Sequence, residues 1–163
     1  MPILVTRWLR RAVLAAILCC SAFGNFAGLA PDDVAIVVPQ DVPVSNISFA
    51  ELRRLMLGEK QYWTSSLHVT LIARAPGSPE RDIVLRTVYQ MSEAQFRQYW
   101  IAKVFRDEVQ NGPRVVYSSE MAGEVAASTP GALAYVDAAQ VPKGLKVLKV
   151  NGLLPGQKGY PLR

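Results

Sequence analysis

The order of the local folding signals along the chain most constrains its fold. Runs of β-branched and other apolar residues, which are typical of buried strands, alternate with segments that begin at a helix-capping residue and carry apolar side chains at helical spacing. Because predicted strands and helices alternate, the sequence favours an α/β layer structure over an all-β sandwich or a helical bundle. The alternation is imperfect, so we expect a mixed sheet rather than a purely parallel one.

Five short segments are predicted to be strands, and four serine-capped segments to be helices. The predicted strands are residues 34–38, 68–73, 115–117, 132–136 and 145–150. The residues expected to cap the helices are Ser48, Ser78, Ser92, and Ser118 or Ser119. The first and third of these have a glutamate or glutamine three residues later, which is the spacing of a capping box. Trp63 and Trp100 are expected to lie in the core or to line a groove.

The first thirty residues have the pattern of a secretory signal peptide. Three arginines precede an apolar run over residues 12–23, and small residues follow it. The run is about half of the ~20 residues needed to cross a bilayer, although a membrane anchor or a buried helix is the alternative interpretation. We expect residues 1–27 to be the signal peptide and residues 32–163 to be one periplasmic or otherwise secreted domain, with no stable membrane span after processing.

The composition outside this leader excludes several classes of function. The three leader arginines supply most of the formal charge of +5, and the remaining +2 does not favour nucleic acid as a partner. Both cysteines, Cys19 and Cys20, also lie in the leader, which excludes disulfides, thiolate catalysis and cysteine metal sites from the mature chain.

The residues available for catalysis or metal binding are few. His68 is the one histidine, and we expect it to have a structural role at the start of a strand. The acidic residues are scattered, and the pair Asp32-Asp33 is expected to be a solvated end rather than a set of ligands. We therefore expect no metal, no cofactor and no enzymatic activity, and a small hydrolase is disfavoured.

The best candidate for a functional site is Arg74-x-x-Gly77-Ser78, at a predicted strand-to-helix junction. Helix N-termini bind anions because their first amides lack partners and carry partial positive charge. Gly77 would let a ligand approach the backbone, and Ser78 would offer a hydroxyl. Arg74 would grip phosphate or carboxylate through two N–H groups. Arg81, one turn further on, would add a second positive charge.

The same residues also have a purely structural interpretation. In it, Ser78 caps the helix, Gly77 forms the turn, and both arginines are solvated. Two neighbours weigh against an anion. Pro79 removes one amide from the helix N-terminus, and Glu80 places a negative charge in the first turn.

Four signatures stand in order along the chain and carry a family resemblance. They are Ser48-x-x-Glu51-Leu52 with Met56-Leu57-Gly58 and Trp63; Arg74-x-x-Gly77-Ser78; Pro130-Gly131-Ala132-Leu133-Ala134-Tyr135-Val136; and Gly159-Tyr160-Pro161-Leu162. Over residues 34–163 the chain thereby resembles the periplasmic phosphate-binding protein of ABC transporters, in the type 2 periplasmic-binding-protein superfamily. The resemblance implies a three-layer α/β lobe with a mixed sheet flanked by helices.

The resemblance also implies a site and a partner. In the family, a two-lobed clamp closes on phosphate, and the arginine and serine matched here by Arg74 and Ser78 contact the anion. Members commonly continue with Gly-Thr where this chain has Pro79-Glu80. The chain is about half the length of a two-lobed binder, and the family's N-terminal anion loop has no counterpart near residues 38–45. It looks like a compact, mostly single-lobe relative.

Two functional hypotheses follow. The first is an extracytoplasmic solute-binding-like protein for phosphate or a related small oxyanion, associated with the membrane component of an ABC-type uptake system. The alternative is a non-catalytic interaction module, derived from a binding-protein lobe that has lost its ligand and contacts another envelope protein. The two differ in whether Arg74 and Ser78 converge on a concave site and whether Glu80 points into it.

Overall fold

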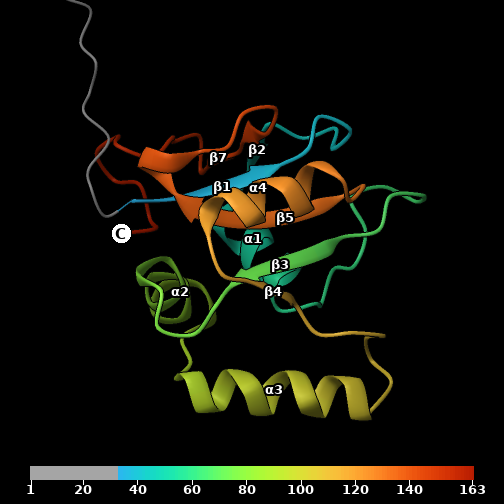
Figure 1. The fold of residues 1–163 in the computed structure, drawn as a ribbon. Coiled ribbons are helices and arrows are strands. Elements are labelled where there is room, and N and C mark those ends of the chain that lie inside the picture. Colours follow the sequence, from blue (N-terminus) through green and yellow to red (C-terminus); the bar gives the residue numbers. More distant parts are fainter. Residues whose placement is uncertain (1–32) are drawn as a thin grey trace, which may run out of the picture.

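The computed structural model describes residues 33–163, so the expected signal peptide lies outside the described residues. No helix in this part of the chain is both long and apolar enough to span a membrane. The elements shown in Figure 1 are β1 (Val34–Val38), β2 (Asn46–Ile47), α1 (Phe49–Met56), β3 (Thr70–Arg74), α2 (Pro79–Val84), a π-helix (Leu85–Tyr89), α3 (Glu93–Phe105), β4 (Arg114–Val116), α4 (Ser119–Ala127), β5 (Ala132–Asp137), a 3-10 helix (Ala138–Gln140), β6 (Lys146–Val147) and β7 (Lys149–Val150).

The main sheet has five strands in the order β4-β3-β5-β1-β6. β3 runs parallel to both of its neighbours, β4 and β5, whereas β1 runs antiparallel to β5 and β6. In this register Leu71 lies opposite Leu133, and Ile36 lies opposite Tyr135. The expected mixed sheet is therefore confirmed.

The predicted strand 145–150 is wrong as a single element. Its first half, β6, pairs with β1 in the main sheet, whereas its second half, β7, pairs with β2 in a separate two-stranded sheet. The change of partner occurs at Leu148, which is fully buried and donates its N–H to the carbonyl of Ile36 at 2.9 Å. Lys149 then donates to the carbonyl of Ser45 at 3.0 Å. The apolar pattern is continuous over residues 145–150, but burial of Leu148 in the core divides the segment into two strands with different partners.

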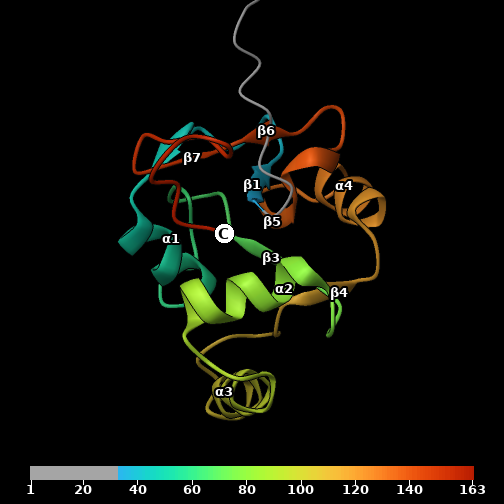
Figure 2. The same ribbon diagram turned by 90° about the vertical axis from the view of Figure 1, so that its left-hand side faces the viewer.

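Three layers arise because both faces of the sheet are apolar. Along β1, Val34, Ile36 and Val38 face a large core beneath α1 and α2, and Ala35 and Val37 face a smaller one. The smaller core is built mainly from alanines of α4 and β5. Figures 1 and 2 show α4 on one side of the sheet and α1 and α2 on the other. This arrangement confirms the expected α/β fold with helices flanking a mixed sheet.

The helices begin at the serines that were predicted to cap them. Ser48, Ser92 and Ser118 each accept a hydrogen bond from the backbone N–H three residues later. The reciprocal half of the box forms only in α3, where the side chain of Gln95 accepts from the N–H of Ser92 at 2.8 Å. In α1 the corresponding glutamate pairs with a lysine beyond the helix instead.

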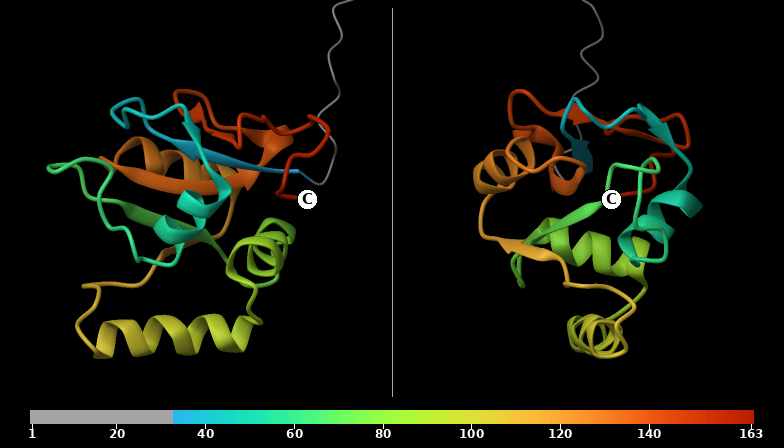
Figure 3. Two further views of the ribbon diagram at one scale, coloured as in Figure 1. Left: turned by 180° about the vertical axis from the view of Figure 1, so that it is seen from behind. Right: turned by 90° about the vertical axis from the view of Figure 1, so that its right-hand side faces the viewer.

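The helix α3 lies at the outer edge of the molecule, apart from the other elements (Figures 1 and 3). Phe96 and Trp100 face inward and are buried. Ile101, Val104 and Phe105 are exposed, and Phe105 has 90% of its surface accessible. Phe96 and Trp100, four residues apart, thus form one inward face of α3, and the C-terminal half of the helix has an uncovered apolar surface.

Tyrosine hydroxyls connect the α3 region to the end of α1. Tyr89 donates to the carbonyl of Met56 at 2.9 Å, and Tyr99 donates to the carbonyl of Leu57 at 2.7 Å. The ring of Tyr89 also packs edge-on against Phe96, with centroids 4.7 Å apart. These contacts satisfy carbonyls at a helix C-terminus, which have no partner within their own helix.

The expectation that Asp33 is solvated is wrong. Its side chain is buried, and its carboxylate accepts a hydrogen bond from the N–H of Gly156 at 2.5 Å and lies 3.0 Å from Nε of Arg163. Tyr160 donates to the carbonyl of Val34 at 2.7 Å beside it. The start and the end of the described chain are thus held together by polar contacts around the buried carboxylate of Asp33.

Gly131 gives a direct test of the packing between β3 and β5. Its φ is +66°, and an added Cβ would lie 2.1 Å from the carbonyl oxygen of His68. Gly152 has φ +80° but open space around the same position. We expect Gly152→Ala to lower the free energy of unfolding by about 1–2 kcal/mol, the ordinary penalty for a residue in the left-handed conformation. Gly131→Ala should cost at least about 3 kcal/mol, because the clash is added.

Urea unfolding of both variants beside the unaltered protein measures these differences. Equal losses of stability in the two variants would contradict the close approach of Gly131 to the start of β3.

Candidate functional site

The predicted site lies where β3 ends and α2 begins. Arg74 is the last residue of β3, and the following N–H of Ala75 donates to the carbonyl of Val116 in the adjacent β4 at 2.8 Å. Gly77 has φ +83°, and a Cβ built there meets no atom within 4 Å. Ser78 then caps α2 by accepting from the N–H of Arg81 at 3.4 Å. The turn is therefore fixed to β4 by a backbone hydrogen bond next to β3, and no neighbouring atom crowds it at Gly77.

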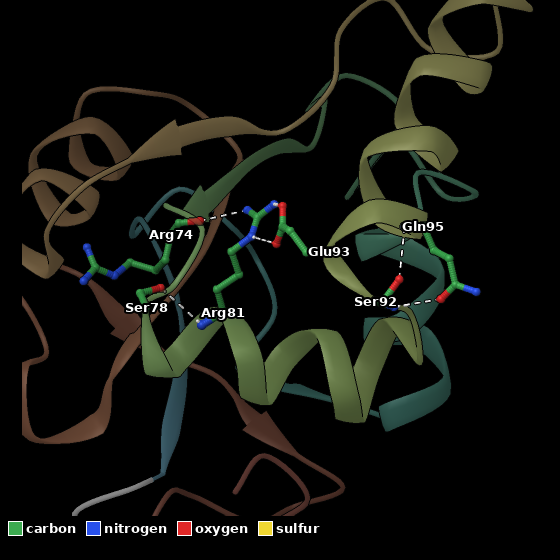
Figure 4. A network of polar contacts seen from close by, with 6 residues as sticks. All are labelled: Arg74, Ser78, Arg81, Ser92, Glu93 and Gln95. Atoms are coloured by element: carbon green, nitrogen blue, oxygen red, sulfur yellow. Dashed lines mark hydrogen bonds and ion pairs between the residues drawn. The ribbon is translucent and has the colours of Figure 1, made fainter.

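The side chain of Arg81 is buried, with only 3% of its surface exposed. Its Nε and Nη2 donate to the two carboxylate oxygens of Glu93, each at 2.8 Å, and its Nη1 donates to the carbonyl of Arg74 at 2.8 Å. The guanidinium also lies 4.6 Å from the centre of the Phe96 ring. Figure 4 shows this network. Arg81 thus joins the end of β3 to the start of α3.

The electrostatics of the Arg81–Glu93 pair follow from these contacts. Burial disfavours a charged arginine, but the hydrogen bond to Glu93 and neighbouring negative groups outweigh burial, so the pKa of Arg81 is raised. The hydrogen bond from Arg81 lowers the pKa of Glu93 from its ordinary value. Both groups are therefore more firmly charged than they would be in water.

The side chain of Arg74 points away from this network (Figure 4). Arg74 is 8% exposed and Glu80 is 9% exposed, and Nε of Arg74 lies 3.6 Å from Oε2 of Glu80. Within residues 33–163, neither the Nε and Nη1 of Arg74 nor this Glu80 oxygen has a hydrogen-bond partner. The two residues thus form a buried pair of opposite charges that is too loose to satisfy either one.

The burial of both arginines contradicts the solvated arginines of the structural interpretation. The capping by Ser78 and the turn at Gly77 follow that interpretation closely. Of the four predicted residues, Arg74, Gly77 and Ser78 lie in one turn. The side chain of Arg81 donates a hydrogen bond to the carbonyl of Arg74 and so fixes this turn.

Two further residues at this end of the sheet were not assigned to the site from the sequence. Glu80 was noted as a repelling charge, not as a partner of Arg74. Ser119 opens α4 directly after β4, is 5% exposed, and its Oγ has no hydrogen-bond partner in the described chain. Because β3 and β4 are parallel, their C-terminal ends bring Arg74 and the start of α4 to the same edge of the sheet. Ligands of α/β proteins commonly bind at such an edge.

Other chemistry is not evident in the described region. Residues 33–163 contain no group of three or more His, Cys, Asp or Glu side chains that could hold a metal ion. A cavity of about 620 Å³ lies at the opposite end of β3, and none of the four predicted site residues lines it.

Solved structures of phosphate-binding proteins of ABC transporters have a similar fold. The chain is similar to a phosphate ABC transporter substrate-binding protein with bound phosphate from Clostridium perfringens (TM-score 0.60, 16% identity, 76% of this chain and 47% of that one). It is also similar to an ABC-type phosphate transport receptor from Vibrio cholerae (TM-score 0.61, 19% identity, 76% of this chain and 48% of that one). A third similar structure is PstS from Borrelia burgdorferi (TM-score 0.61, 20% identity, 80% of this chain and 54% of that one). Neither a protein-family model nor a curated protein sequence matches the chain.

The TM-scores of 0.60 and 0.61 show a shared fold. The chain spans about half the length of the structures it matches. It therefore has the α/β fold of a periplasmic-binding-protein lobe.

The Arg81–Glu93 pair predicts how stability depends on pH. The pKa of Glu93 is lowered in the folded protein from an unfolded value of about 4.5, so its contribution is present above that pH and is lost as the pH falls further. Glu93→Gln should lower stability at neutral pH by about 1–3 kcal/mol, because Arg81 keeps a buried charge with fewer acceptors. The variant should also be less sensitive to acid than the unaltered protein.

Urea unfolding at pH 7 and near pH 3 measures both effects, with the exposed Glu124→Gln as the control. An acid dependence in Glu93→Gln as steep as that of the unaltered protein would show that the pair does not contribute.

Proposed function

We propose that this protein is an extracytoplasmic solute-binding-like protein that holds a small oxyanion, such as phosphate, at the turn between β3 and α2. The observation that carries the proposal is the buried guanidinium of Arg74, which has two unpartnered N–H-bearing nitrogens beside a turn that is open at Gly77. The similar structures are phosphate-binding proteins of ABC transporters, which supports the choice of anion.

The contacts available to an oxyanion are of three kinds. Nε and Nη1 of Arg74 are covered by protein atoms, and they would donate charge-assisted hydrogen bonds, which are stronger in a buried site than in water, once the anion displaces Glu80. The hydroxyl of Ser78 accepts from a backbone N–H, which leaves its own proton free to donate to a ligand oxygen. Gly77 adds no side chain that would shield the turn. Binding of this kind needs no covalent step.

Arg81 would support the same site mainly by position. Its charge lies one helical turn away, and its hydrogen bond to the carbonyl of Arg74 fixes the backbone from which the Arg74 side chain extends. In this proposal Arg74 contacts the ligand, and Arg81 positions the turn that carries Arg74.

Glu80 opposes the ligand at this site. Its carboxylate already lies beside Arg74, so an incoming anion must displace it or share the guanidinium with it. Removing two charges from water is costly, and a loose pair recovers only part of that cost. An oxyanion with better hydrogen-bond geometry would therefore replace Glu80 as the partner of Arg74. Competition with Glu80 would lower the affinity of the protein for that anion.

The remaining features of the proposal concern the cellular setting. Residues 1–27 would direct export, and residues 32–163 would form the working domain. The membrane component of an ABC transporter, or another envelope protein, would be the partner. Because ligand sites usually bury most of their ligand, a partner that covers the open side of the lobe would increase affinity.

Neutralising Glu80 should strengthen anion binding. We expect Glu80→Gln to bind phosphate at least about tenfold more tightly than the unaltered protein, because the competing charge is removed. The double variant Arg74→Gln/Glu80→Gln should bind no phosphate, and it leaves no unpaired buried charge that could unfold the protein. Isothermal titration calorimetry with phosphate, and then with sulfate, measures all three proteins.

Equal affinities in Glu80→Gln and the double variant would remove Arg74 from the site. If Glu80→Gln is folded and gives no heat with either anion, oxyanion binding by this protein is refuted.

The alternative function, an envelope interaction module, is favoured by a different observation. The exposed apolar side chains include Ile101 and Phe105 on α3, Tyr117 between β4 and α4, and Met121 in the first turn of α4. Exposed apolar surface of this kind commonly marks a protein contact. Failure of anion binding in the experiment above would favour this module.

A further inference from the structure

We propose that the cavity at the N-terminal end of β3 is a second binding site, which takes a small anion with an apolar body, such as an aromatic carboxylate or sulfonate. The cavity has a volume of about 620 Å³, within the range of about 300–1,000 Å³ that is usual for small-molecule sites. It lies between the start of β3, the end of α1, α3 and the connection from α3 to β4.

This site is separate from the Arg74 turn. Thr70 and Leu71 at the start of β3 line the cavity, together with the preceding Val69, whereas Arg74 is at the other end of the strand. A strand of this length places its two ends about 13 Å apart. The two sites can therefore be altered independently.

The apolar part of the cavity is suited to an aromatic or branched body. Its wall includes Leu55, Val69, Leu71, Trp100 and Val109. A large indole in such a wall offers a flat apolar face for stacking.

The position of the indole is fixed by Gly58 at the end of α1. Gly58 has φ +66°, and an added Cβ would lie 3.0 Å from Cη2 of Trp100 and 3.4 Å from a side-chain methyl of Val109. The absence of a side chain at residue 58 therefore lets the ring lie directly against the backbone. Edge-on packing of Tyr99, 5.6 Å away between ring centres, and of Phe96 at 6.3 Å further restricts the ring.

The polar part of the cavity favours a negative charge. The lining contains Lys60 and Arg114 together with His68 and side-chain amides, and it contains no aspartate or glutamate. Lys60 is already paired with Glu51. Arg114 is exposed and has no ion pair or side-chain hydrogen bond within residues 33–163. Arg114 is thus the cation available to a ligand.

One buried donor of the lining residues also lacks a partner. Trp100 is 6% exposed, and its Nε1 has no acceptor within the described chain, whereas Nε1 of Trp63 donates to the carbonyl of Gly131 at 2.9 Å. A buried donor without an acceptor is destabilising. The acceptor oxygens of an anionic ligand complement Arg114, whereas this indole N–H is covered by protein atoms and reaches them only after a shift of the cavity wall.

The test uses 1-anilinonaphthalene-8-sulfonate, an aromatic sulfonate whose fluorescence rises in apolar sites, and N-phenyl-1-naphthylamine, which has the same rings without the sulfonate. Gly112→Phe fills the cavity with little strain elsewhere, because a Cβ at residue 112 meets only Cβ of Trp100 at 3.8 Å. Arg114→Gln removes the charge. Arg97→Gln, at an exposed arginine on α3 outside the cavity lining, is the matched control. Cooperative thermal unfolding verifies that each variant is folded.

We expect saturable binding of the sulfonate at one site, a loss of at least about tenfold in Gly112→Phe, and a loss of about two- to fivefold in Arg114→Gln, the size of one exposed ion pair. Arg97→Gln should bind normally, and the neutral amine should not respond to Arg114→Gln. If folded Gly112→Phe binds the sulfonate as the unaltered protein does, or if the unaltered protein shows no saturable binding, the proposal is overturned.

Discussion

The buried guanidinium of Arg81 is the interaction on which the arrangement of this lobe depends. It lies on α2, but its hydrogen bonds reach backward to the last carbonyl of β3 and forward to Glu93 at the start of α3. One side chain thereby fixes the strand end, the turn and the outlying helix relative to one another. A buried charge that loses a hydrogen-bond partner is destabilising, so replacement of any partner of Arg81 should loosen all three elements. The orientation of Arg74 depends on the same carbonyl.

The two charged residues of the turn have opposite effects on a ligand. Arg74 offers unpartnered donors in a buried position, which suits an oxyanion, and Glu80 already supplies a carboxylate at the same place. Under the proposed function, the affinity for an oxyanion would be set by how well the external anion competes with this internal carboxylate.

Local signals predicted the elements of the fold well, and longer-range packing decided the rest. The β-branched run at β1, the capping box at Ser92 and the mixed sheet were all read correctly, because each depends on neighbouring residues or on the alternation of elements. The division at Leu148 and the burial of Asp33 depend on contacts with residues more than one hundred positions away. The sequence could place Arg81 one turn beyond Ser78, but not reveal that its side chain turns toward Glu93. The cavity beside Trp100 likewise arises from four separate segments.

We propose that Arg74, and not Arg81, receives an oxyanion at this turn. Nitrogen-15 NMR of the arginine side chains during a phosphate titration distinguishes the two residues, with the Nε–Hε signals assigned by substitution of each arginine. We expect the Arg74 signal to shift saturably as phosphate displaces Glu80, while the Arg81 signal, held by Glu93, stays in place. An Arg74 signal that does not move at saturating phosphate, or a shift of the Arg81 signal alone, would contradict it.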